Sequence, residues 1–152
     1  MKDDGPREKK WRFLYLRSDK LHRSQQLGID YPRMSQRQKL ESETINILFV
    51  CSMNKWRSPT AEKIYRNKPW ISVRSVGTSS KAKRHVSAKD LKWADLVIAM
   101  ESKHVQRLKA VFPEVMRYKE VYTLDVEDCY QYMHPDLVEE LTEAINPILE
   151  NL

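Results

Sequence analysis

The sequence has only two cysteines, Cys51 and Cys129, and they lie far apart in the chain. Small secreted scaffolds that depend on disulfides carry more cysteines at closer spacing, so this composition argues against that class. The sequence also lacks a signal-peptide pattern and any apolar run that approaches membrane-spanning length. We therefore expect a cytoplasmic protein that makes no membrane contact.

Internal repeats and low-complexity tracts are also missing from the folded part of the sequence. With 152 residues, 41% of them apolar, the chain is long enough for one domain with one core. The four histidines are scattered without the spacing of metal ligands, and we expect them at surfaces or helix caps. They are His22, His85, His104 and His134.

Most of the basic excess lies at the start of the chain. The net charge is +6, and residues 1–44 hold 11 Lys and Arg against 7 Asp and Glu. This stretch is polar with little periodicity, so we predict a flexible basic extension over 1–44 and a folded domain over 45–152. Basic residues that alternate with Trp11, Phe13 and Tyr15 leave contact with nucleic acid as an alternative. We favour a solvated extension, because charge runs are unspecific.

From residue 45 onward, apolar segments alternate with helical patterns. Apolar runs occupy 45–50, 70–76, 94–100 and, more weakly, 118–124. Runs of this kind are typical of strands buried on both faces of a parallel sheet. Helical patterns occupy 58–68, 87–93, 102–112 and 134–152. The alternation predicts a small three-layer α/β domain, with a four-stranded parallel sheet flanked by helices.

The segment "CSMNKWRSPT" follows the first predicted strand, at the sheet edge where α/β folds bind ligands. Ser58 precedes Pro59, so we expect Ser58 to be the N-cap and Pro59 the first residue of the next helix. The unpaired N–H groups there, together with the planar fork of Arg57, would hold a tetrahedral oxyanion. Their positive field favours the thiolate form of Cys51. We therefore predict a phosphate-binding loop with Cys51 as its nucleophile.

At these residues the sequence resembles the low-molecular-weight protein tyrosine phosphatases, whose loop reads C-x-x-N-x-x-R-S-P. The segment "CSMNKWRSPTAE" matches that loop, and "SVGT", "ADLVIAMESKH" and "VEDCY" are similar to further family segments in the same order. The resemblance covers residues 45–152. It implies the same α/β fold as predicted above. It also implies that the protein hydrolyses phosphotyrosine or aryl phosphates without a metal or a cofactor. The implied substrate is a phosphorylated protein or a small aryl phosphate.

The resemblance also implies a role for each matching catalytic residue. Cys51 would attack phosphorus, and Arg57 and the loop amides would hold the phosphate oxygens. Asp128 would protonate the leaving oxygen and then activate water to cleave the cysteinyl-phosphate. Asp125 is a second candidate for the acid in "LDVEDCY". Asp128 is favoured because the residues after it are in register with the family's D-P-Y.

Substrate binding is predicted for the loop and two flanking positions. Ser58 would stabilise the thiolate, and Asn54 would brace the loop through Ser75. Tyr130 and Tyr132 would form aromatic walls around a phenyl ring, with packing under the last helix as the alternative. The predicted binding residues are Ser52, Met53, Asn54, Lys55, Trp56, Ser58, Ser75 and Tyr130.

The sequence departs from the family at three places. Met53 stands where the family usually has glycine, and it would be strained if that position required a positive φ. Trp56 stands where a second cysteine is common. Only "SSKAKRHVSAKD" connects "SVGT" to the third strand's approach, where the family has a longer loop and helix. Because Lys81, Lys83 and Arg84 occupy what remains, we expect a preference for substrates with additional negative charge.

Two other functions fit parts of this pattern. An arsenate reductase shares the loop and the fold, but it needs further cysteines for its redox step and Cys129 is the only other thiol. A non-catalytic module that binds phosphate or phosphoproteins would keep the loop and lose turnover, through strain at Met53 or a misplaced acid. Hydrolysis of p-nitrophenyl phosphate separates the phosphatase from the binding module.

Overall fold

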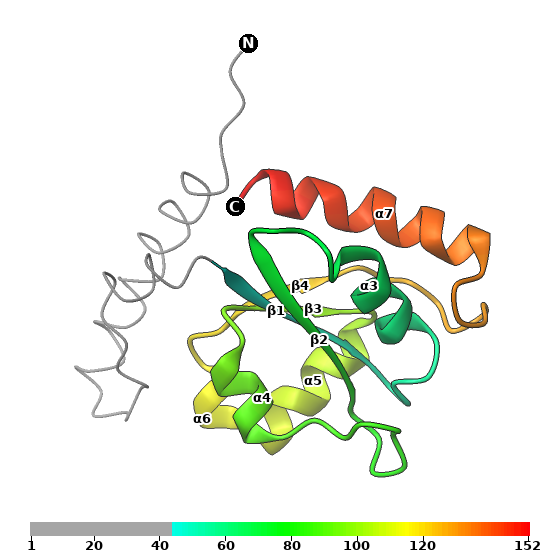
Figure 1. Ribbon diagram of the computed structural model, residues 1–152. Coiled ribbons are helices and arrows are strands. Elements are labelled where there is room, and N and C mark those ends of the chain that lie inside the picture. The colour runs from blue at the N-terminus through cyan, green and yellow to red at the C-terminus, as the bar shows by residue number, and fades with distance from the viewer. Residues whose placement is uncertain (1–43) are drawn as a thin grey trace.

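The computed structural model describes residues 44–152, so the predicted basic extension lies outside the described residues except for Thr44. The described chain alternates strands and helices, as predicted (Figure 1). Its elements are β1 (Ile45–Cys51), α3 (Arg57–Tyr65), β2 (Ile71–Gly77), α4 (Ala88–Trp93), β3 (Leu96–Ala99), α5 (Ser102–Val111), α6 (Pro113–Met116), β4 (Glu120–Thr123) and α7 (Pro135–Glu150).

The four strands form one parallel sheet in the order β2-β1-β3-β4, which confirms the predicted fold class. In the register of the sheet, Cys51 lies opposite Gly77, and Val50 lies opposite Ala99. The carboxyl ends of β1, β2 and β3 therefore meet at one edge. The chain leaves β1 toward β2 on one side and returns to β3 on the other. In open α/β sheets such a point of reversal is where ligands bind.

Helices cover both faces of the sheet, and β1 supplies residues to both cores (Figure 1). Side chains of successive strand residues point to opposite faces. Phe49 and Cys51 accordingly join the core beneath α3 and α7, whereas Leu48 and Val50 join the core against α4, α5 and α6. Cys51 thus reaches the functional edge from the α3 side of the sheet.

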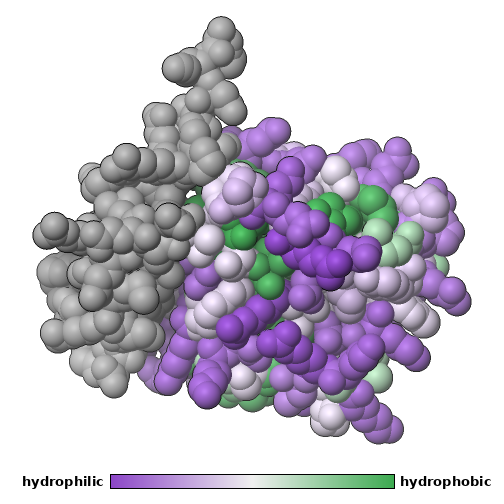
Figure 2. Space-filling model, viewed as in Figure 1, coloured by the Kyte–Doolittle hydropathy of each residue, from purple (hydrophilic) through white to green (hydrophobic). Residues whose placement is uncertain are grey.

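The sequence did not predict α6, a single turn of four residues that is too short to show a helical period. The apolar signal of β4 is weak because none of its residues is fully buried, and Tyr122 and Thr123 are exposed at this edge of the sheet. In the view of Figure 2, hydrophilic residues cover most of the described surface and hydrophobic ones show in small areas. Within residues 44–152, no helix combines the length and hydropathy that a membrane crossing requires.

Candidate active site

The loop that follows β1 joins the buried sheet to the start of α3. Cys51 is the last residue of β1 and is 2% exposed, and α3 begins at Arg57. The predicted N-cap is wrong: Trp56 holds that position without a side-chain cap, and Ser58 is the second residue of the helix. Pro59 is the third, where a missing N–H loses no intrahelical hydrogen bond. Ser58 instead turns its hydroxyl toward the cysteine.

Two hydrogen-bonding groups surround the sulfur of Cys51. The hydroxyl oxygen of Ser58 lies 2.9 Å from Sγ, and the backbone N–H of Asn54 donates to Sγ over 3.2 Å. When the sulfur is a thiolate, Ser58 must be the donor of its pair. Hydrogen bonds to an ionised partner are the stronger kind, so both stabilise the thiolate over the thiol.

Asn54 braces the loop from inside. Its backbone has φ 52°, a left-handed conformation that Asn tolerates better than most residues. Its side-chain amide donates to the hydroxyl oxygens of Ser58 and Ser75, each over 3.0 Å, and Ser75 donates to Glu62 over 2.5 Å. The structure therefore joins Asn54 and Ser75. Strain at Met53 is not found, since Met53 is absent from the positive-φ residues of the described chain.

Arg57 is buried, with 1% of its surface exposed. Its Nη1 donates to the Glu101 carboxylate over 2.5 Å and to the Val126 carbonyl over 2.8 Å. Its Nε has no hydrogen-bond partner among the described residues, and the nearest acid is Asp128 Oδ1, 3.6 Å away. A buried donor without a partner costs about 1–3 kcal/mol, so such groups call for an explanation. An oxyanion bound in the loop would supply the missing acceptor.

Glu101 is a site residue that the sequence did not predict. It lies just beyond β3, at the same sheet edge as the loop, and its hydrogen bond from Arg57 lowers the pKa of its carboxyl. The anionic carboxylate fixes one end of the guanidinium, which leaves the Nε side for a ligand. A signal was present in "ADLVIAMESKH", where Glu101 stands in place of the family's aspartate.

His104 was expected at a surface or in a helix cap. It is buried, and it takes part in the cap at the start of α5. Its Nδ1 accepts from the Glu101 backbone N–H over 3.0 Å, so the proton of the neutral ring lies on Nε2. Nε2 then donates to the hydroxyl of Ser52 over 2.8 Å. Burial and, second, the charge of Arg57 lower the pKa of His104 to about 4. A neutral histidine thus holds the first residue of the loop.

The remaining histidines fall outside the site. His134 caps α7 by accepting from the Asp136 N–H over 3.1 Å, and His85 is exposed. His22 lies outside the described residues. Within residues 44–152, no three His, Cys, Asp or Glu side chains are grouped so that they could hold a metal ion.

The segment that follows β2, residues 78–83, holds the loop from its other side; we call it the strap. Three of its backbone N–H groups, from Thr78, Ser79 and Lys83, donate to the carbonyls of residues 51, 52 and 53 over 2.9, 2.9 and 3.0 Å. Gly77 begins this contact, and a Cβ there would lie 2.5 Å from the Ser52 carbonyl oxygen. The strap therefore ties the loop's carbonyls away from the face that would receive an anion.

The segment after β4 brings Asp128 to the site. Asp125, in the same segment, makes no such contact with Arg57. Asp125 is exposed and has φ 62°, whereas Asp128 reaches the guanidinium of Arg57. Tyr130 is half-buried, with its ring centroid 5.1 Å from that of His134, and it packs against the core beneath α7. Of the two predicted roles for Tyr130, its geometry therefore fits packing under the last helix. Tyr132 instead lines a groove beside the loop.

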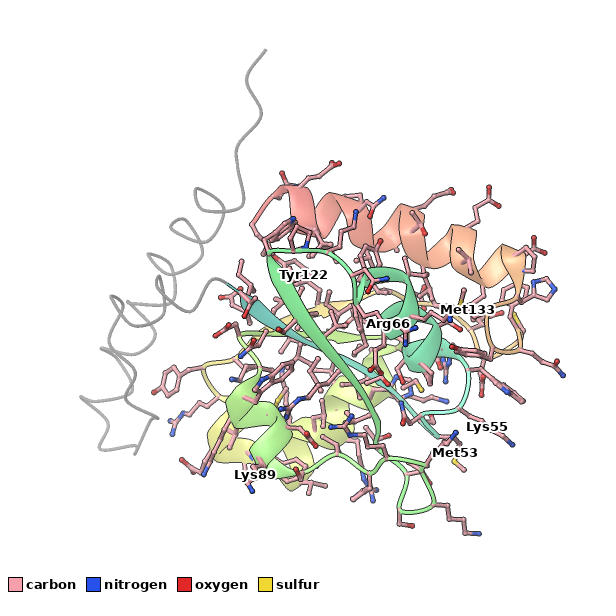
Figure 3. The ribbon with its side chains drawn as sticks, in the orientation of Figure 1. Met53, Lys55, Arg66, Lys89, Tyr122 and Met133 are labelled. Atoms are coloured by element: carbon pink, nitrogen blue, oxygen red, sulfur yellow. The ribbon has the colours of Figure 1, made fainter. Side chains whose placement is uncertain are left out.

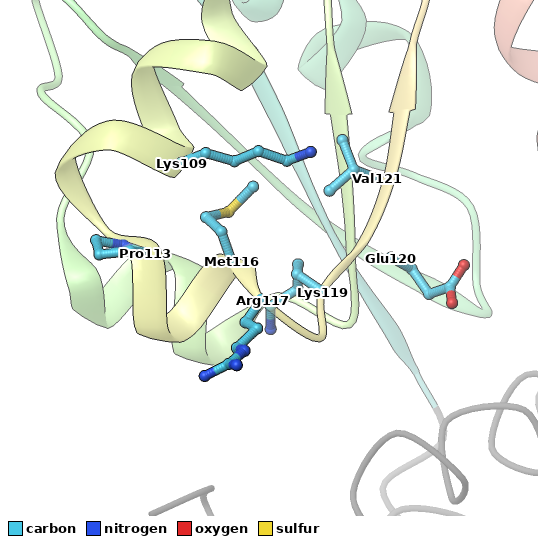
Figure 4. A pocket seen from close by; sticks show the side chains of 7 residues that line it. All are labelled: Lys109, Pro113, Met116, Arg117, Lys119, Glu120 and Val121. Carbon is cyan, nitrogen blue, oxygen red and sulfur yellow. The ribbon is translucent and has the colours of Figure 1, made fainter. Parts of the chain in front are cut away.

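That groove has a volume of about 770 Å³ and adjoins the loop directly. Met53 and Lys55 lie together at this end of the molecule, far from Lys89 on α4 (Figure 3). The groove is lined by Asn54, Lys55, Trp56, Pro59, Glu62, Ser75, Lys83, Arg84 and Tyr132. A second hollow, of about 530 Å³, lies between α6 and the start of β4 and includes no loop residue (Figure 4).

No protein-family model matches the chain. The low molecular weight protein-tyrosine-phosphatase Etp of Escherichia coli (strain K12) is 30% identical over 94 residues, which cover 46% of this chain and 64% of Etp. The match thus spans less than two thirds of that relative's length.

Solved structures of phosphatases resemble the chain in fold. A low molecular weight protein tyrosine phosphatase from T. tengcongensis has a TM-score of 0.62 and 26% identity, over 72% of this chain and 100% of that one. The YwlE arginine phosphatase from Geobacillus stearothermophilus has a TM-score of 0.56 and 25% identity, over 70% of this chain and 91% of that one.

Proposed function

Because the chain is related in sequence and in fold to the low-molecular-weight protein tyrosine phosphatases, we propose that it is a cysteine-dependent phosphomonoesterase. Its substrates are phosphotyrosine in a protein or small aryl phosphates. The observation that carries the proposal is the buried Cys51 sulfur, held by Ser58 and Asn54, on the same loop as the unpaired Nε of Arg57. A cytoplasmic location and the division at residue 44 stay predictions from the sequence.

In the first step, the Cys51 thiolate attacks phosphorus and the bond from phosphorus to the leaving oxygen breaks. Arg57 Nε and the loop N–H groups hold the equatorial oxygens, whose charge spreads in the transition state. Asp128, 3.6 Å from Arg57 through its Oδ1, donates a proton to the leaving oxygen as that oxygen gains charge. The products are a neutral alcohol or phenol and a cysteinyl-phosphate.

In the second step, Asp128 takes a proton from a water molecule that attacks phosphorus. The bond from sulfur to phosphorus breaks, and inorganic phosphate and the thiolate are released. Ser58 stabilises that thiolate as the leaving group by donating from its hydroxyl, 2.9 Å from Sγ. No redox change occurs, so Cys129 has no part in this cycle.

The test is hydrolysis of p-nitrophenyl phosphate by the full chain and by Cys51→Ser. We expect the variant to lose at least about a thousandfold in kcat, because a serine hydroxyl is scarcely ionised. Its affinity for inorganic phosphate or vanadate should persist, since Arg57 and the loop amides remain. Near-normal turnover in the variant contradicts the cysteine mechanism. Phosphate binding by the natural chain without any hydrolysis favours the non-catalytic module.

The arsenate reductase alternative gains no support from the two thiols. Cys51 is buried and Cys129 is exposed, and both are free. Reduction of arsenate coupled to thiol oxidation, measured beside the phosphatase assay, would revive it. Strain at Met53 was one reason to expect a loop that binds phosphate without turnover. That reason no longer holds, because Met53 has no positive φ.

A further inference from the structure

The groove beside the phosphate loop is lined by cations that the proposed chemistry does not use. We propose that it binds a second anionic group of the substrate: a carboxylate or a second phosphate beside the phosphotyrosine of an acidic peptide. This inference rests on the proposed function, and it adds the substrate class. The groove is next to the catalytic loop because Asn54, Lys55 and Trp56 belong to both.

The charges of the groove favour an anion. Lys55, Lys83 and Arg84 line it, against one carboxylate, Glu62. Glu62 is already the acceptor of the 2.5 Å hydrogen bond from Ser75. The side chain of Arg84 is half-exposed, and its Nη2 lies 3.9 Å from Asp90, at the limit of an ion pair. The positive charges therefore remain available to a ligand that enters the groove.

Both walls of the groove are fixed relative to the loop. On one side, the Lys83 backbone N–H donates to the Met53 carbonyl over 3.0 Å. On the other side, the residue after Tyr132 donates its backbone N–H to Thr60 Oγ1 of α3 over 2.9 Å. The backbone that carries Lys83 is thus held beside the loop that would bind the scissile phosphate. Such preorganisation improves affinity because little ordering is needed on binding.

The aromatic residues of the groove suit a peptide that carries an aryl phosphate. Tyr132 lines the groove and is exposed, and the ammonium of Lys55 lies 5.4 Å from the ring centroid of Trp56. A phosphoarginine would bring a guanidinium toward these cations, which like-charge repulsion disfavours. The groove therefore favours phosphotyrosine with acidic neighbours.

The structure also revises which residues act. The sequence predicts the charge preference from Lys81, Lys83 and Arg84, but Lys81 does not line the groove and Lys55 does. Lys81 is exposed on the same strap, and Lys89 is exposed on α4, away from the loop (Figure 3). These two lysines provide a control that removes the same total charge from outside the groove.

The experiment compares two phosphotyrosine peptides that differ only in flanking residues, Glu in one and Gln in the other. We expect the full chain to show a kcat/KM about tenfold higher for the Glu peptide at low salt, which is about 1.4 kcal/mol. The preference should shrink at about 0.5 M salt. In Lys83→Gln with Arg84→Gln, the ratio of the two peptides should fall toward unity. In Lys81→Gln with Lys89→Gln, most of the preference should remain.

Each outcome decides one claim. Equal rates for the two peptides, or an equal loss of preference in both double variants, overturns the groove assignment while p-nitrophenyl phosphate turnover upholds the phosphatase. If the natural chain hydrolyses nothing, the proposed function fails, and binding of the same peptides by tryptophan fluorescence then decides the groove. Circular dichroism checks that each variant is folded.

Discussion

Among single residues, the choice between Asp125 and Asp128 as the acid shows what the sequence leaves open and what the structure adds. Both lie in one short segment after β4, and only the family register favoured Asp128. In the structure Asp128 Oδ1 lies 3.6 Å from Arg57 Nε, whereas Asp125 is exposed in a left-handed conformation. The geometry supports Asp128 as the proton donor that we propose.

A proton donor matters most when the leaving oxygen is strongly basic. We therefore expect Asp128→Asn to slow the phosphorylation of Cys51 by phenyl phosphate about 100-fold or more, and by p-nitrophenyl phosphate far less. Single-turnover burst rates separate this step from hydrolysis of the intermediate. Asp125→Asn is the matched control and should change neither rate much. The opposite pattern in the two variants would assign the acid to Asp125.

At the scale of elements, the strap after β2 determines how the loop presents its N–H groups. The family has a longer connection at this point, and here a few residues take over the contact with the loop. The strap uses three backbone hydrogen bonds to the loop carbonyls, so its geometry depends on how closely it approaches. The approach is close at Gly77, where an added Cβ would lie within 2.6 Å of the Ser52 carbonyl oxygen and the Ala82 Cβ.

Gly77→Ala should therefore displace the loop or the strap. We expect kcat/KM for p-nitrophenyl phosphate to fall at least about tenfold, and the free energy of unfolding to fall by about 1–3 kcal/mol. Ser80→Ala, in the same strap and exposed, is the control and should change neither quantity much. Adding Ala82→Gly to Gly77→Ala removes the side-chain clash and leaves the two with the backbone, at the Ser52 oxygen and the Asn54 nitrogen. Full recovery in that double variant would show that the backbone approach does not matter.

Across the whole molecule, a buried histidine of the site links its protonation to the stability of the fold. His104 is almost fully buried, and its pKa is lowered to about 4 because burial and the charge of Arg57 disfavour the protonated ring. In the unfolded chain a histidine titrates near about 6.5. Below that pH the unfolded chain binds more protons than the folded one, so acidification favours unfolding.

The free energy of unfolding should therefore fall by about 2 kcal/mol from this group alone between about pH 7 and pH 5. His104→Asn removes the titration, so its stability should be flatter across this window, although lower by about 1–2 kcal/mol at neutral pH through lost hydrogen bonds. Urea denaturation of both proteins measures the difference. Glu101 titrates below this window, because Arg57 lowers the pKa of its carboxyl. Parallel curves would show that His104 is protonated equally in the folded and unfolded chains.

Much of the fold followed from the sequence, because local patterns report burial and turn chemistry. The runs that became β1 and β3 are apolar without alternation, since helices cover both faces of the sheet there. The strand β4 gave a weaker signal because its residues are partly buried or exposed. The short helix α6 and the start of α3 at Arg57 were missed. Ser58 and Pro59 suggested an N-cap at Ser58, but the hydroxyl of Ser58 contacts the sulfur of Cys51 instead.

The local sequence was enough to predict the parts of the site that one loop contains. Cys51, Asn54, Arg57 and Ser58 lie within eight residues, so a strand followed by a helix brings them close together. The partners that come from other strand ends depend on how the chain folds. Glu101 reaches Arg57, and His104 reaches Ser52, because β3 pairs directly with β1. Sequence spacing carries no record of that pairing, which depends on the order of strands in the sheet.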